Sequence, residues 1–147
     1  MDWYFSLADT ANLEAWRDLR AHHFAIYPKG LTVANGSAQA TAAQVLTLAT
    51  IEWVRRERPD HLLAFVDHLM TAIACGGKIG DPQALSDMAG AAGLDRLGAD
   101  ADAETVVFAN LAQWRQLGSP DLPCLVRTDG HVLVGHNPAE HLARFAA

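Results

Sequence analysis

The sequence is poor in cysteine, in clusters of basic residues and in long apolar runs, and each shortage excludes a class of protein. Cys75 and Cys124 are too few and too far apart for a secreted disulfide framework or a zinc site. The net charge of -6 gives no basic face for a nucleic-acid backbone. No stretch approaches the ~20 apolar residues that span a bilayer, and residues 1–5 lack the features of a secretory signal. We expect a cytoplasmic protein with free thiols.

Motifs of common enzyme classes are also missing. The sequence has no Gly-x-Gly-x-x-Gly turn, Walker loop or nucleophile elbow. His61 and His68 are seven positions apart, whereas metal ligands on one helix need a spacing of three or four. His131, His136 and His141 could meet near the end of the chain, but surface or hydrogen-bonded histidines are the better explanation. We expect no metal and no cofactor.

The composition and the first residues predict one domain that begins with a strand and a helix. Half of the 147 residues are hydrophobic and 19% are charged, which suffices for a single core. Residues 2–7 are aromatic and apolar and predict a strand. Asp9 or Thr10 can cap the helix predicted after it. Residues 23–27 predict a second strand that stops at Pro28, because proline cannot donate to a ladder.

The middle of the chain changes to a helical period. After a turn signal at residues 35–37, residues 38–58 carry apolar side chains mostly at helical spacing. Residues 59–60 end this helix and begin another. Asp81 followed by Pro82 predicts the start of a third helix, and Asp102 that of a fourth.

The end of the chain predicts a β-hairpin and a last helix. Two apolar segments, residues 122–127 and 131–135, are joined by the turn at 128–130, with a proline at the entrance. Asn137 then provides an N-cap, with Pro138 at the first helical position and a capping-box glutamate two residues later.

This order of elements, strand-helix-strand, four helices, strand-strand-helix, fits an α/β thioredoxin-like fold with an inserted helical subdomain. The thioredoxin-like part would comprise about residues 1–30 and 119–147, and the helical insert about residues 37–118. Both parts would belong to a single domain.

Several short motifs carry a resemblance to a known superfamily. They are Trp3-Tyr4-Phe5 ahead of a turn and Trp16, Tyr27-Pro28-Lys29-Gly30-Leu31, Gly77-Lys78-Ile79-Gly80-Asp81 with Leu85, Gly93-Leu94-Asp95, and Leu122-Pro123 ahead of a hairpin. Together they resemble the DsbA superfamily over most of the chain, although the insert is shorter than usual after Gly36. The cytoplasmic predicted protein-disulfide isomerases are most similar, followed by the branch of kappa glutathione transferases and hydroxychromene-carboxylate isomerases.

The resemblance places the two redox-cysteine positions on Asp9 and Asn12. In the disulfide-exchanging members the first cysteine lies at a helix N-terminus, whose free amides stabilise the thiolate. Neither residue here can exchange a disulfide. Asp9 also replaces the serine that positions the glutathione thiol in the kappa branch, and a carboxylate would repel a thiolate. An N-cap, worth about 1 kcal/mol, is the alternative role for Asp9.

The resemblance also implies a binding role for the start of the hairpin. Pro123 matches the residue that is cis in thioredoxin folds, and Leu122 beside it would offer its backbone amide and carbonyl to an extended peptide or to glutathione. An ordinary trans proline at a strand start is the alternative. Cys124 could support a one-cysteine mechanism, but its apolar neighbours predict a small buried side chain without an activated thiol. We predict no catalytic residue, and a binding site of Asp9, Asn12, Leu122, Pro123 and Cys124.

The predicted function is that of a DsbA-family protein without the redox pair, which serves as a binding or assembly module. Its ligand would be a peptide or a small thiol, and the module would act alone or as a homodimer, without nucleic-acid or membrane partners. The alternative is an enzyme of the same fold, either a thiol oxidoreductase or isomerase that uses Cys124, or a glutathione-dependent transferase or isomerase. A thiol ligand near Asp9 or a reactive Cys124 would favour the enzyme.

Overall fold

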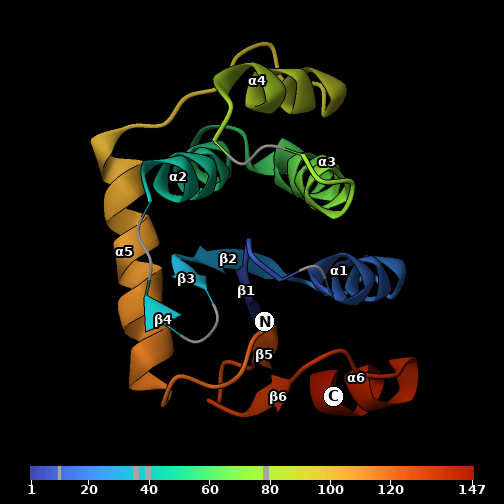
Figure 1. The fold of residues 1–147 in the computed structure, drawn as a ribbon. Helices are drawn as coiled ribbons and strands as arrows, with labels where there is room; N and C mark the ends of the chain where they lie inside the picture. The colour runs from blue at the N-terminus through green and yellow to red at the C-terminus, as the bar shows by residue number, and fades with distance from the viewer. Residues whose placement is uncertain (10, 35–36, 39–40, 78–79) are drawn as a thin grey trace.

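A mixed four-stranded sheet in the order β2-β1-β5-β6 organises the fold (Figure 1). The computed structural model describes residues 1–9, 11–34, 37–38, 41–77 and 80–147. The strands of the sheet are β1 (Asp2–Ser6), β2 (Tyr27–Leu31), β5 (Cys124–Val126) and β6 (Val132–Val134). β1 pairs in parallel with β2 and antiparallel with β5, and β5 pairs antiparallel with β6. The central position of β1 explains why its sequence is aromatic and apolar.

Most of the remaining described residues are helical. In chain order the helices are α1 (Asn12–Ala21), α2 (Ala42–Glu57), the 3-10 turn η1 (Pro59–His61), α3 (Leu62–Ala74), α4 (Pro82–Ala91), α5 (Ala101–Gln116) and α6 (Ala139–Ala146). The four helices α2 to α5 separate the N-terminal strands from the final hairpin, as the sequence predicts. A small separate hairpin of β3 (Val33–Ala34) and β4 (Ser37–Ala38) was not predicted.

Side chains of β1 alternate between the two faces of the sheet, and on each face they are buried in a core. Trp3 and Phe5, stacked with their ring centroids 4.8 Å apart, belong to the larger core, to which α1, α2, α3 and α6 also contribute. Tyr4 faces the other way, into a smaller core in which α5 provides Leu111 and Trp114. Figure 1 shows α5 at one side of the sheet and α1 and α6 at the other. The smaller core therefore depends on how α5 is held.

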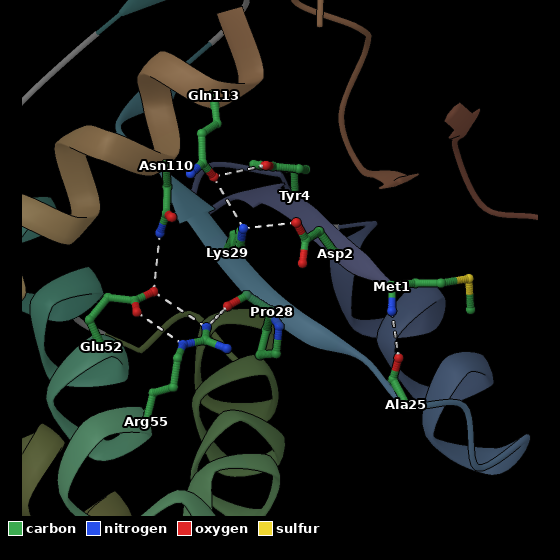
Figure 2. A network of polar contacts seen from close by, with 10 residues as sticks. All are labelled: Met1, Asp2, Tyr4, Ala25, Pro28, Lys29, Glu52, Arg55, Asn110 and Gln113. Carbon is green, nitrogen blue, oxygen red and sulfur yellow. Dashed lines mark hydrogen bonds and ion pairs between the residues drawn. The ribbon is translucent and has the colours of Figure 1, made fainter. Parts of the chain in front are cut away.

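A buried polar network joins α5 to α2 and β2 (Figure 2). The Glu52 carboxylate accepts hydrogen bonds from Arg55 Nε at 2.9 Å and from Asn110 Nδ2 at 3.1 Å. Arg55 also donates to the carbonyl oxygen of Pro28. The Glu52 side chain is only 5% exposed, and a buried carboxylate is stable only when it is paired and hydrogen-bonded, as here. The network thus fixes α5 relative to the sheet.

One turn further along α5, Gln113 makes a second link to the sheet (Figure 2). Its Oε1 accepts hydrogen bonds from Lys29 Nζ at 3.1 Å and from the Tyr4 hydroxyl at 3.4 Å. Lys29 also pairs with Asp2 at 2.8 Å. Burial raises the pKa of Tyr4 to about 12. These contacts hold the second half of α5 against β1 and β2.

Pro28 lies inside β2, so the prediction that the second strand stops there was wrong. β2 is an edge strand, and its Tyr27 amide donates to the Met1 carbonyl at 2.9 Å. Because backbone groups alternate in direction along a strand, Pro28 points to the outer edge, where its missing N–H costs no ladder bond. The strand also begins later than expected, at Tyr27 rather than His23.

Asp81 was predicted correctly as a helix cap, whereas the caps predicted at Asp9, Asp102 and Asn137 were wrong. Asp81 caps α4, with Pro82 at the first helical position, as predicted. The cap of α5 is Asp100, whose side chain accepts from the Ala103 amide at 2.9 Å, and Asp102 lies within the first turn. Asn137 does not cap α6: its amide group donates to the carbonyls of two residues at the end of the hairpin instead. The expectations for Thr10, for residues 35–36 and for residues 78–79 lie outside the described residues.

Candidate functional site

An open pocket of about 500 Å³ lies between the β1–α1 turn and the segment that precedes β5. We call it the turn pocket. Its lining residues are Ser6, Ala8, Asp9, Val33, Trp114, Ser119, Pro120, Asp121 and Leu122. They come from the end of β1, the start of β3, the last turns of α5 and the connection from α5 to β5. The volume is in the range of small-molecule and peptide side-chain sites.

Side-chain hydrogen bonds hold the β1–α1 turn in place. Asp9 Oδ1 accepts from the Ala11 amide at 2.9 Å, which closes an Asx turn just before α1. The Ser6 hydroxyl donates to the Val33 carbonyl, and Asn12 Nδ2 donates to the Ser6 carbonyl. The prediction that Asp9 caps α1 was therefore wrong: its carboxylate supports the turn, and α1 begins after Ala11 without a side-chain cap.

Asn12, the second predicted redox position, does not line the turn pocket. Its side chain is buried, and its Nδ2 is used by the hydrogen bond to Ser6. Its Oδ1 has no hydrogen-bond partner in the described part of the chain. Asn12 thus belongs to the support of the turn rather than to its solvent-facing surface.

Trp114 forms the end of the pocket nearest α5. Its indole Nε1 donates to the Pro120 carbonyl at 3.0 Å, which ties the connection from α5 to β5 to the helix itself. Within this connection Ser119 adopts a positive φ of 52°, uncommon for a residue with a side chain. After this reversal, residues 119–122 line the turn pocket together with Trp114 and the β1–α1 turn.

The Leu122–Pro123 peptide bond is cis, the isomer that the resemblance implies. Leu122 is half-buried and lines the turn pocket, whereas Pro123 is buried and its carbonyl accepts from the Gly135 amide at 2.7 Å. No backbone hydrogen bond joins the amide or carbonyl of Leu122 to another described residue. Leu122 thus lines the pocket with a backbone that has no backbone partner in the described part of the chain.

Neither cysteine lines the turn pocket. Cys124 is 1% exposed and lies opposite Tyr4 in the sheet. Burial raises the pKa of its thiol to about 12, so it carries almost no thiolate at neutral pH. Cys75 is exposed at the end of α3, and both thiols are free. The predicted burial of Cys124 is confirmed.

The charged residues that line the pocket are both acidic, Asp9 and Asp121. Asp121 was not predicted as a site residue, and neither were Trp114 and Ser6, which the sequence presents as ordinary core positions. Among the described residues, no three histidine, cysteine or acidic side chains lie close enough together to hold a metal ion. No helix that the structure describes is long and apolar enough to cross a membrane.

Comparison with solved structures supports the predicted fold. A periplasmic thioredoxin-like protein from Salmonella enterica serovar Typhimurium matches with a TM-score of 0.76 at 16% identity, over 99% of this chain and 80% of that one. Proteus mirabilis ScsC in a compact conformation matches with 0.72 at 13% identity, over 99% and 79%. The catalytic domain of Proteus mirabilis ScsC gives 0.69 at 16% identity, again over 99% and 79%.

Sequence comparisons do not assign this chain to a family. No family model and no curated protein sequence match this chain. The structural matches share too few identical residues to transfer a function, but they cover nearly the whole chain, inserted helices included. This chain has an α/β thioredoxin-like fold with an inserted helical region, and it has no pair of neighbouring cysteines.

Proposed function

We propose that this protein is a non-redox binding module, which holds an extended polypeptide segment in the turn pocket. The observation that carries this proposal is that one pocket is lined both by a sulfur-free turn at Asp9 and by Leu122, whose backbone has no backbone partner among the described residues. In thioredoxin-like folds this is the place where dithiol chemistry occurs, and here a carboxylate occupies it. Binding remains feasible without a cysteine, because it needs only the backbone and the pocket walls.

An extended peptide suits the chemistry of the pocket. The amide and carbonyl of Leu122 can pair with a peptide backbone as one strand pairs with another, and side chains on one face of that peptide would enter the pocket. The pocket walls combine apolar groups of Val33 and Trp114 with the hydroxyls of Ser6 and Ser119. A pocket with mixed polar and apolar walls suits a single peptide side chain better than a flat apolar surface of a partner protein.

The alternative, a thiol- or glutathione-dependent enzyme, has less support. An oxidoreductase that uses Cys124 would need a thiolate, whereas that thiol is buried and its pKa is raised to about 12. Glutathione is an anionic ligand with a net negative charge, and Asp9 and Asp121 would repel it. The binding module requires neither a thiolate nor an anionic ligand.

A peptide-binding experiment tests the proposal. The protein would be immobilised and offered a library of cysteine-free ten-residue peptides of random sequence. We expect a subset to bind, and binding to be lost in Ala8→Phe, which puts a ring into the pocket from an exposed position of its wall. Ala11→Phe is the matched control, because Ala11 is exposed in the same turn and does not line the pocket. Equal binding by both variants would contradict the proposal.

A second experiment tests the absence of redox function. Insulin reduction and the oxidative refolding of a reduced protein should both stay at the background rate. Activity above background would favour the enzyme hypothesis. Cys75→Ala and Cys124→Ala would then show which thiol is responsible.

A further inference from the structure

The turn pocket has a charge pattern that predicts more than peptide binding. Asp9 and Asp121 are its charged lining residues, and no lysine, arginine or histidine is among the nine. Neither carboxylate forms an ion pair with any residue that the structure describes. Some other acidic groups do have a cationic partner, such as Asp67 with Arg20 and Asp100 with Arg56.

The free oxygens of these two carboxylates are available to a ligand. Asp9 uses Oδ1 for the Ala11 amide, which leaves Oδ2 without a partner among the described residues. Asp121 is exposed, and no hydrogen bond to its side chain is present in that part of the chain. Two like charges in one concave site produce a stronger negative potential than either would on a flat surface. The negative potential weakens the binding of an anionic ligand and strengthens the binding of a cationic one.

The walls of the pocket restrict which cation fits. The site offers two carboxylates, and the described residues contain no group of three histidine, cysteine or acidic side chains that could hold a metal ion. Val33 and Trp114 present apolar surface beside the charges. A lysine or arginine side chain matches both features, because its aliphatic stem packs on apolar groups while its charged end reaches a carboxylate.

We propose that the turn pocket selects a basic residue, lysine or arginine, in the polypeptide segment that it binds. This inference rests on the proposed function, since it names the class of segment that the same pocket accepts. The selectivity comes from Asp9 and Asp121 together. The backbone of Leu122 contributes affinity that is independent of the peptide sequence.

Three matched peptides test this inference. Each is a fluorescent seven-residue chain of alanine and glycine with blocked termini, and the central residue is arginine, citrulline or glutamate. Citrulline has nearly the shape of arginine without its charge. By fluorescence anisotropy in 20 mM salt, we expect the arginine peptide to bind about tenfold more tightly than the citrulline peptide, and the glutamate peptide to bind most weakly. The difference should shrink in 200 mM salt, since screening weakens exposed charge pairs.

Charge-neutralising variants assign the effect to the pocket. Asp9→Asn retains an oxygen for the Ala11 amide and removes the charge, and Asp121→Asn changes an exposed side chain. Each should reduce the preference for arginine over citrulline about threefold, and the double variant should abolish it. Asp102→Asn is the control, because this exposed residue lies about 18 Å along α5 from Trp114. It should leave the preference unchanged.

The outcomes separate this inference from the proposed function. Equal binding of the three peptides, lost in Ala8→Phe, would overturn the charge selection and leave the binding module standing. No binding of any peptide would overturn both. A preference that persists in the double variant would place the selection elsewhere. Spermidine added as a competitor distinguishes a free polyamine from a peptide: displacement of the arginine peptide by an equimolar amount would overturn the assignment to a polypeptide.

Discussion

The buried thiol of Cys124 leads to a prediction about its alkylation. At pH 8 a thiol with the ordinary pKa of 9.0 is ionised in about one molecule in ten, whereas one with a pKa of about 12 is ionised in about one in ten thousand. Because the thiolate is the nucleophile, native Cys124 should react with iodoacetamide at least ~1,000-fold more slowly than an ordinary thiol. Its 1% exposure slows the reaction further, since the reagent must wait for local opening.

Cys75 serves as the internal control in the same molecule. It is exposed at the end of α3, so it should be modified while Cys124 is not. Peptide mass spectrometry after timed quenching would give both rates, and both cysteines should react quickly in guanidinium chloride. Native modification of Cys124 at a rate close to that of Cys75 would refute the reasoning and revive the one-cysteine mechanism.

The same pKa difference predicts how stability depends on pH. Below about pH 9 the Cys124 thiol is protonated in both the folded and the unfolded state, so it does not make the free energy of unfolding depend on pH. Between about pH 9 and 12 the unfolded state releases the proton and the folded state keeps it, so the free energy of unfolding falls by about 1.4 kcal/mol per pH unit. Tyr4, whose pKa is raised from 10.0 to about 12, adds to this loss above pH 10. Urea unfolding of Cys124→Ala should show a shallower decline, and an identical slope would contradict the assignment.

Three further predictions concern stability, all measured by urea unfolding. Asp9→Ala should cost about 1 kcal/mol by removing the acceptor of the Asx turn; an unchanged midpoint with lost peptide binding would restrict Asp9 to a ligand role. Arg55→Met should cost about 3 kcal/mol, because it leaves the Glu52 carboxylate, 5% exposed, without its cation; adding Glu52→Gln should recover part of this loss, and no recovery would argue against the pair. Gly30→Ala should cost about 1–3 kcal/mol, since a Cβ there would lie 2.1 Å from Leu48 Cδ2; wild-type stability would show that α2 can move away from β2.

The sequence predicted the elements whose structure is determined by neighbouring residues in the chain. Asp81 with Pro82 defines a helix start by itself, and the aromatic run in β1 signals a strand buried on both faces. Prediction failed where tertiary context decides. Pro28 reads as a strand end, but an outer edge tolerates it. Asp100 and Asp102 are equivalent as caps by sequence, and packing of the first turn of α5 selects the first.

The candidate site was predictable in part for the same reason. Asp9 and Leu122, two of the predicted binding residues, both line the turn pocket. Asn12 and Cys124 point into buried surroundings, because their strand and helix positions face the core. Trp114 could not be anticipated, since its role depends on a hydrogen bond to Pro120 across the reversal after α5. Contacts of this kind leave no periodic signal in a sequence.

The proline in β2 also affects how this protein resists aggregation. An open sheet edge can recruit strands from other molecules, because its outward amides and carbonyls are unpaired. At Pro28 in β2 the outward N–H is missing, and the outward carbonyl accepts a hydrogen bond from Arg55. A strand from another molecule would therefore pair poorly with the β2 edge. The opposite edge strand, β6, has three residues, none of them proline, and its Val134 is exposed. Intermolecular pairing under mild destabilisation should therefore start at β6, where a lysine in place of Val134 would suppress it.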